Sequence, residues 1–227
     1  MISAWRRLRN HPAFPWVAPF VLFLLLLVAG PRLPFGVWEQ PLRVAALAAG
    51  LWFFSRPVID LAVSRPAAST LLGAAVFVIW VAPDVLWPGY RDHWLFTNAL
   101  TGPDGGPLPE GFTSSPMAIA FRAVRAAVLV PVIEELFWRG WLMRWIIRSD
   151  FESVPLGAYS GRAFWITAAL FASEHASFWG VGLLAGIAYN WWMVRTRRLG
   201  DCILAHAVTN GLLSAYVIAG ERWEYWL

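Results

Sequence analysis

Apolar residues are grouped along the chain into runs that end at arginine, acidic residues, proline or glycine. A helix that crosses the hydrocarbon layer needs roughly 20 mostly apolar residues, with a range of about 17 to 25. Such windows predict an all-α fold, a polytopic transmembrane helical bundle of about seven or eight spans. The candidate windows are residues 14–30, 42–55, 67–87, 117–143, 163–178, 180–194 and 201–219. The second, fifth and sixth windows are short, so one of them can be tilted or re-entrant.

Arg6, Arg7 and Arg9 precede the first apolar run, as basic residues do in a secretory signal peptide. The run is long for a signal sequence, contains Pro15 and Pro19, and lacks a cleavage site of small residues. It predicts an uncleaved first span, with a signal peptide as the alternative.

Composition agrees with a membrane protein. Of the 227 residues, 59% are apolar and only 14% are charged, whereas soluble domains average about 45–50% and about 25%. All 18 basic residues are arginine, and the net charge is +4. The arginines lie singly between apolar stretches, a distribution that does not favour nucleic acid as a partner. The single Cys202 can form neither an intramolecular disulfide nor a CxxC site.

The distribution of arginine predicts the orientation, because short cytoplasmic loops carry the positive excess. The loop at 88–116 is rich in Gly and Pro and mostly acidic, which places it outside together with the C-terminal end. The N-terminus is then cytoplasmic, and arginine-only basicity with high alanine content hints at a bacterial inner membrane. The arginines assigned to the cytoplasmic side are Arg6, Arg7, Arg9, Arg56, Arg65, Arg144, Arg148, Arg162, Arg195, Arg197 and Arg198.

Polar residues inside the predicted spans are the informative ones, because a charge at the bilayer centre costs about 2.5 to 3.5 kcal/mol on insertion scales. They fall into four groups. These are Glu134, Glu135 and Arg139 in VPVIEELFWRG, Glu174 and His175 in FASEHASF, His206 and Asn210 in HAVTN, and Arg122 with Arg125.

Helical spacing separates these residues by role. Glu135 and Arg139 are four apart, so they can pair on one face, and a structural ion pair is the simplest interpretation. Glu134 lies about 100° round the helix and has no cation at its own spacing. An unpaired carboxylate inside a membrane predicts a functional site. His206 and Asn210 also share one face.

Depth in the membrane allows these groups to meet. At about 1.5 Å per residue from the nearest cytoplasmic arginine, Glu134 lies roughly 15 Å deep and His175 roughly 20 Å. His206 and Asn210 lie roughly 12 and 18 Å deep on the same scale. We expect one intramembrane cavity, reached from the cytoplasmic half.

Three further sets of residues have simpler explanations. Glu174 is either an additional acid in the cavity or, as we favour, a residue near the outer interface. Arg122 and Arg125 are expected to snorkel to the outer surface. The tryptophans, including Trp191 and Trp192, are expected to form interfacial belts.

A glutamate and a histidine in a low-dielectric cavity can activate one water molecule as a general base. A second histidine and an asparagine can donate hydrogen bonds to the oxyanion that forms on an attacked carbonyl. This set predicts amide hydrolysis, and no serine or cysteine lies in a nucleophile motif. Zinc held by Glu134, His175 and His206 is the alternative, although the HExxH spacing is absent.

At this point the chain resembles a known family. EELFWRG is similar to the EExxxR motif, FASEH to FxxxH and HAVTN to HxxxN of the CPBP intramembrane proteases. That family includes type II CAAX prenyl endopeptidases and bacteriocin-processing or self-immunity proteins. The three motifs occur in the family's order, and the VPVIEE segment also resembles CAAX-protease-related proteins of bacterial exosortase systems.

The resemblance implies an intramembrane endopeptidase. Glu134 and His175 would activate water, and His206 with Asn210 would stabilise the oxyanion. Glu135 and Arg139 would hold the site together. The family has been described both as metalloproteases and as metal-independent glutamate proteases; we favour the second, which needs no cofactor, with zinc as the alternative. Glu174, directly before the histidine, departs from the resemblance, because the family usually has an apolar or small residue at that place.

We therefore expect a cytoplasm-accessible site that cleaves a membrane-associated peptide or protein. Residues 1–116 would add spans and an extracytoplasmic loop, residues 117–219 the protease core, and residues 220–227 a tail. Two alternatives are a non-catalytic scaffold or immunity protein of the same family, and a small proton-coupled transporter. A transporter would more naturally show inverted repeats, and the sequence has none that is convincing.

Overall fold

The computed structural model describes residues 6–7, 9–30, 34–98 and 108–226 of the chain. All elements in these ranges are helices. The main helices are α2 (Phe14–Ala29), α3 (Glu39–Gly50), α4 (Pro66–Leu86), α5 (Pro116–Val124), α6 (Val130–Glu135), α7 (Met143–Ile147), α8 (Gly161–Ser173), α9 (Trp179–Thr196) and α10 (Leu199–Gly220).

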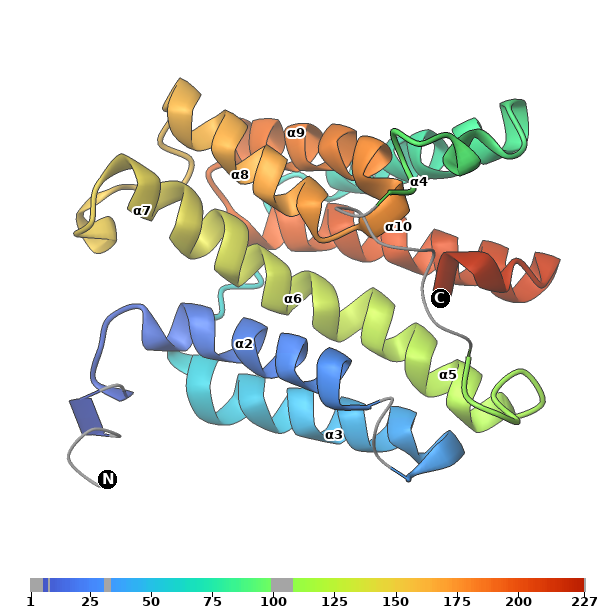
Figure 1. Ribbon diagram of the computed structural model, residues 1–227. Coiled ribbons are helices and arrows are strands. Elements are labelled where there is room, and N and C mark those ends of the chain that lie inside the picture. The colour runs from blue at the N-terminus through green and yellow to red at the C-terminus, as the bar shows by residue number, and fades with distance from the viewer. Residues whose placement is uncertain (1–5, 8, 31–33, 99–107, 227) are drawn as a thin grey trace.

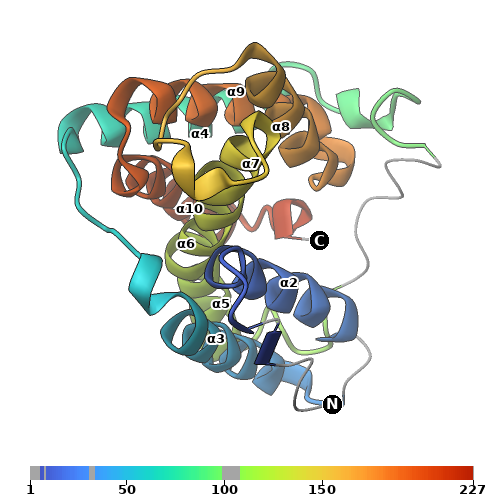
Figure 2. The same cartoon turned by 90° about the vertical axis from the view of Figure 1, so that its left-hand side faces the viewer.

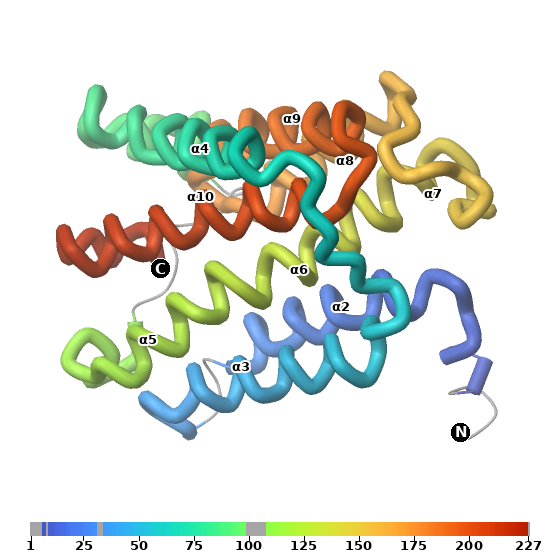
Figure 3. Tube along the Cα trace, turned by 180° about the vertical axis from the view of Figure 1, so that it is seen from behind, coloured from blue at the N-terminus to red at the C-terminus, as the bar shows by residue number. Residues whose placement is uncertain are grey.

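Helices α5, α6 and α7 form one continuous rod, Pro116–Ile147, because π-helical turns at Arg125–Leu129 and Leu136–Leu142 join them. Figure 1 shows this rod running obliquely through the middle of the molecule, with α2 and α3 on one side. Helices α4, α8, α9 and α10 cover its other side, and the view along the bundle in Figure 2 separates the same two groups. Seen from behind, α4 lies against α10 (Figure 3).

Successive helices run in opposite directions, so the connections gather at two ends (Figures 1 and 3). One end holds the start of α2, the segment between α3 and α4, and the loops after α7 and α9. The predicted cytoplasmic arginines occur in these segments. The opposite end holds the start of α5, the loop before α9 and the end of α10. The alternation predicted from the arginines is thus present, and the assignment of one end to the cytoplasm stays a prediction.

Among the described residues, three helices are long and apolar enough to cross a membrane: Pro66–Leu86, Pro116–Ile147 and Leu199–Gly220. Phe14–Ala29 is apolar but shorter. The predicted count of seven or eight spans is therefore not confirmed. The rod has 32 residues and a length of about 48 Å, more than a hydrocarbon layer of about 30 Å, so it must tilt or protrude.

Helix ends differ from the predicted windows at two places that matter for the site. The rod continues to Ile147, beyond the window that ended at 143. Helix α8 ends at Ser173, and His175 lies in the turn before the short helix Ala176–Phe178, not inside a span that continues to 178. This early end allows the chain to reverse into α9 beside the histidine.

Small residues and a buried carboxylate hold α4 against α10. A Cβ atom on Gly73 would lie 2.3 Å from the Ala205 carbonyl oxygen, so only glycine permits this backbone approach. Asp201, at the start of α10, accepts hydrogen bonds from the backbone of Ser64 and Arg65 at 3.0 and 2.8 Å. Asp201 therefore fixes the N-terminal end of α4 to α10.

The predicted tryptophan belt is only partly correct. Trp191 is exposed, as expected for an interfacial residue. Trp192 is buried, and its indole nitrogen donates to the Ser69 hydroxyl at 3.1 Å. Its role is to pack α9 against α4, because a buried indole N–H needs an acceptor.

Candidate active site

Glu134 and Glu135 lie at the C-terminal end of α6, between the two π-helical turns. The first turn has a cause in the sequence, because Pro131 has no N–H to donate to the carbonyl groups before it. The Val130 N–H bonds to the carbonyl of Arg125, five residues back. Insertions of this kind are frequent at functional sites because they redirect the side chains that follow.

Glu135 is the centre of a buried network. Its Oε1 accepts from Arg139 Nη1 at 3.0 Å and contacts His206 Nδ1 at 2.9 Å. Both Glu135 and Arg139 are 0% exposed. The ion pair that helical spacing predicts is therefore present, and it also joins the rod to α10 through His206.

Arg139 extends the network to α9. Its Nε donates to Asn190 Oδ1 at 2.9 Å and its Nη2 to the Gly186 carbonyl at 3.3 Å. Asn190 in turn donates to the Phe164 carbonyl of α8 at 2.8 Å. The guanidinium carbon also lies 4.7 Å from the centre of the Phe171 ring. Arg139 therefore links the rod to α9 directly, and to α8 through Asn190 and the Phe171 ring.

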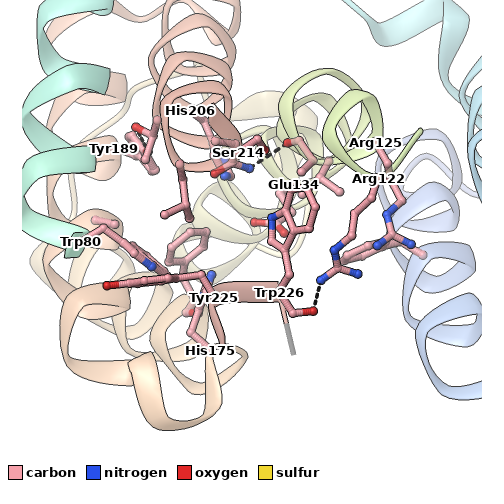
Figure 4. A pocket seen from close by; sticks show the side chains of 18 of the residues that line it. Trp80, Arg122, Arg125, Glu134, His175, Tyr189, His206, Ser214, Tyr225 and Trp226 are labelled. Carbon is pink, nitrogen blue, oxygen red and sulfur yellow. Dashed lines mark hydrogen bonds between the residues drawn. The ribbon is translucent and has the colours of Figure 1, made fainter. Parts of the chain in front are cut away.

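Glu134 has a different environment, although it is the adjacent residue. It is 7% exposed, and its Oε2 has no hydrogen-bond partner within the described part of the chain. Glu134 lines a cavity of about 260 Å³ together with His175, His206 and Asn210 (Figure 4). The four residues predicted to be catalytic thus share one cavity.

The tautomer of His175 follows from its contacts. Its Nδ1 lies 2.7 Å from the Phe171 carbonyl, which can only accept, so Nδ1 carries the proton. Nε2 of the neutral ring is then an acceptor. A Cβ atom on Gly182 would lie 3.2 Å from the His175 ring, so this glycine makes room for the imidazole. The structure places a basic nitrogen on the same cavity as the free carboxylate.

The contacts of His206 assign its tautomer in the same way. Its Nδ1 donates to a carboxylate that only accepts, and its ring stacks on Tyr189 with 5.0 Å between centroids. Nε2 is again an acceptor when the ring is neutral and a donor when the ring is protonated. Tyr189 was not anticipated from the sequence.

Asn210 fills a gap that the π-helical turn leaves. Its Nδ2 donates to the Ala126 carbonyl at 2.9 Å. In the π-helical pattern that carbonyl would need the N–H of Pro131, which does not exist. One N–H of the Asn210 amide is thereby used, and the second is available to a bound group.

A metal site was tested on the described residues. No three His, Cys, Asp or Glu side chains in those ranges lie close enough together to hold a metal ion. The alternative zinc set of Glu134, His175 and His206 lines one cavity but is not assembled as a ligand cluster.

The cavity extends toward the end of the bundle opposite to the one that the sequence predicted. Its lining continues from Glu134 to Arg122 and Arg125 near the start of the rod, and to Tyr225 and Trp226 after α10. These residues belong to the end of the bundle opposite the arginine-rich end (Figure 1). A site reached from the arginine-rich side is therefore not what the structure shows. Helical depth alone could not reveal this, because it carries no information on which helices leave space between them.

Arg122 and Arg125 line the cavity, although the sequence predicted that both would snorkel to the outer surface. Arg125 is 5% exposed and lines the cavity, so it does not snorkel to the surface. Arg122 also lines the cavity and donates to the Trp226 carbonyl (Figure 4). Glu174 is exposed at the end of α8 and is absent from the cavity lining, as the favoured of its two interpretations predicted.

Tyr225 closes the wall opposite the rod. Its hydroxyl donates to Asp84 of α4 at 2.9 Å. Burial raises the pKa of the Tyr225 phenol, and the hydrogen bond to Asp84 acts in the same direction. The phenol therefore stays protonated and remains a donor.

Comparison with known proteins agrees with the motifs. The family described as type II CAAX prenyl endopeptidase Rce1-like matches residues 116–212. The match begins at the first residue of the rod and includes all four cavity residues predicted to be catalytic, as well as Glu135 and Arg139. No curated protein and no solved structure matches the chain.

Proposed function

Because residues 116–212 belong to the Rce1-like family of type II CAAX prenyl endopeptidases, we propose that the protein is an intramembrane endopeptidase that uses Glu134 to activate water. The observation that carries the proposal is the contrast at residues 134 and 135. Glu135 accepts two hydrogen bonds at its Oε1, whereas Glu134 has no hydrogen-bond partner within the described residues and lines a cavity together with His175. A buried free carboxylate is retained when it has chemistry to perform.

The reaction proceeds by proton transfers that balance. Glu134 accepts a proton from water, with His175 Nε2 orienting the same molecule, and the hydroxide attacks the peptide carbonyl carbon. Electron density moves to the carbonyl oxygen, where the second N–H of Asn210 donates a hydrogen bond, as does His206 Nε2 when its ring is protonated. When the C–N bond breaks, the proton held by Glu134 passes to the leaving nitrogen. Glu135 acts by orienting His206 through Nδ1.

The substrate is a membrane-associated peptide or protein, because the cavity lies among helices able to span a bilayer. We assign the protein to a plasma membrane of bacterial type, with residues 117–219 as the protease core. The cavity extends away from the arginine-rich end, so substrate enters from the opposite end. If the arginines mark the cytoplasm, that entry is extracytoplasmic.

Cleavage of a membrane-delivered reporter peptide library tests the proposal. Purified wild type, Glu134→Ala and the matched surface variant Glu152→Ala are reconstituted in vesicles, with and without a zinc chelator. We expect loss of cleavage in Glu134→Ala only, and full activity with the chelator. Loss on chelation, restored by zinc, would replace the water-activating glutamate with a metal held by Glu134, His175 and His206. Full activity of Glu134→Ala would contradict the proposed role outright.

A further inference from the structure

A second wall of the same cavity carries positive charge that the proposed reaction does not use. Arg122, Ala126, Val130 and Glu134 follow one another at intervals of four residues along the rod, and all four line the cavity. Arg125 lines it too. The cavity therefore has a carboxylate at one end of a helical face and guanidinium groups at the other, as Figure 4 shows.

Arg125 lacks the partners that a buried cation needs. It is 5% exposed, and its Nη1 has no hydrogen-bond partner within the ranges that the structure describes. The charges that act on it are two further arginines, Arg122 and Arg43, and one carboxylate, Glu39. That carboxylate already pairs with Arg43. The wall consequently carries an excess of positive charge.

A buried unpaired cation is costly, by several kcal/mol for the ion alone. The same chain shows how it stabilises a buried arginine that serves the fold, since Arg139 has a carboxylate, an amide and a carbonyl as partners. Arg125 has none of these. A guanidinium fork aimed into a cavity fits a carboxylate, which it binds through two parallel hydrogen bonds.

Resting on the proposed function, we propose that Arg125, assisted by Arg122, forms a specificity subsite for a carboxylate of the peptide substrate. Nine residues of helix separate Arg125 from Glu134, a distance of about 13 Å. An extended peptide advances about 3.3 Å per residue. The carboxylate is therefore about four residues from the bond that is cleaved. It is supplied by an Asp or Glu side chain or by the C-terminus of the substrate.

Arg122 couples binding of the substrate to the segment after α10. Its guanidinium donates to the Trp226 carbonyl and lies 5.2 Å from the centre of the Trp226 ring. A substrate carboxylate competes with that neutral carbonyl for the same donors, and a charged acceptor forms the stronger hydrogen bond. Binding of the substrate thus releases Trp226 from Arg122.

The test uses the full chain in vesicles of zwitterionic phosphatidylcholine, whose headgroup carries no net negative charge. Each peptide carries one Asp, and the position of the Asp moves stepwise along the peptide from one to the next. For each Asp peptide there is a matched Asn peptide. Both are made with a free and with an amidated C-terminus. The kcat/KM of wild type is expected to favour carboxylate over amide by about tenfold or more at one position. The free and amidated arms show whether the side chain or the C-terminus supplies the group.

Variants assign that preference to Arg125. Arg125→Met is expected to lose the preference while it still cleaves the Asn peptides. The surface variant Arg195→Met is expected to behave as wild type. An Asp-to-Asn ratio near one throughout in wild type, or an unchanged ratio in Arg125→Met, overturns the subsite.

Two readouts separate this inference from the proposed function. Peptide binding to Glu134→Gln reports the subsite without cleavage, so charge-selective binding that depends on Arg125 supports the subsite even if wild type cleaves nothing. Thermal unfolding without peptide reports the fold. Arg125→Met is expected to be as stable as wild type or more so, because an unpaired buried charge is removed. A loss of stability comparable with that of Arg139→Met would assign Arg125 to the fold and overturn the proposal.

Discussion

Two adjacent glutamates of the site differ in their hydrogen bonds. Glu135 accepts from Arg139 and His206, both within 3.0 Å. Glu134 faces a cavity, and its Oε2 has no partner within the described ranges. The same contrast separates the arginines: Arg139 donates to three groups, whereas Arg125 is buried and its Nη1 has no partner within the described ranges.

This difference indicates which residues stabilise the bundle and which are available for the reaction. Removing one partner of a buried ion pair strands a charge and destabilises the fold. Removing a buried charge that has no partner takes away a cost and leaves the fold intact or more stable. Substitutions on the two sides of α6 should therefore have opposite effects, and this can be measured.

The largest expected effect is on catalysis at Glu134. Glu134→Gln keeps the size of the side chain and removes the base, so we expect kcat to fall by about 10³-fold with unchanged thermal stability. The measurement is cleavage per folded molecule in vesicles, with Glu152→Gln as the surface control. A variant that loses stability and activity in parallel would place Glu134 with Glu135 in the fold, and the comparison would break.

Next in size is the loss of Arg139. Arg139→Met strands the Glu135 carboxylate, and we expect the free energy of unfolding to fall by about 3 to 5 kcal/mol. Denaturation in detergent measures it, with the exposed Arg148→Met as control. The double variant Glu135→Gln and Arg139→Met should recover part of the loss, because no charge is then stranded. Equal losses in the single and double variants would contradict the ion pair as the cause.

Asn210 sharpens the comparison because it bears on both the fold and the reaction. Asn210→Ala removes an N–H from the oxyanion, for which we expect about a 10²-fold loss in kcat. It also leaves the Ala126 carbonyl without its donor, at a cost of about 1 to 3 kcal/mol in stability. Steady-state kinetics and thermal unfolding of the same preparation separate the two. A stability loss with unchanged kcat would limit Asn210 to the helix contact.

The smallest effect on stability and activity is expected for the Tyr189 hydroxyl, which lies behind His206. The Tyr189 hydroxyl donates to Thr209 Oγ1 at 2.8 Å, and the ring supports His206. Tyr189→Phe keeps the ring, so we expect a loss of about 1 kcal/mol in stability and little change in kcat. Tyr159→Phe, at an exposed position, is the matched control. A large fall in kcat would mean that the hydroxyl itself takes part in the reaction.

The sequence predicted the features that depend on local spacing. Helices occur at each of the predicted windows, and the Glu135–Arg139 pair follows from an interval of four residues. Three motifs on three segments also predicted which residues would meet. Short-range periodicity suffices for these features because both members lie on one helix or within one motif.

Features that depend on tertiary packing were not predictable in the same way. The groups that donate to Asp201 lie 132 to 137 residues away in sequence, and Asn190 joins Arg139 across 51 residues. Arg125 was expected at the surface because a lone arginine near a helix end usually snorkels. Its burial depends on helices α2 and α3 covering the rod, which no local pattern encodes. The direction in which the cavity extends has the same origin.

The most direct test of the central claim is the fate of the water oxygen. Wild type in vesicles cleaves a reporter peptide in a single turnover in ¹⁸O-water, and mass spectrometry locates the label. Activation of water by Glu134 predicts one ¹⁸O atom in the new carboxylate of the product and none on Glu134. An unlabelled product with ¹⁸O on Glu134 would show that the glutamate attacks the peptide itself, and it would contradict the account.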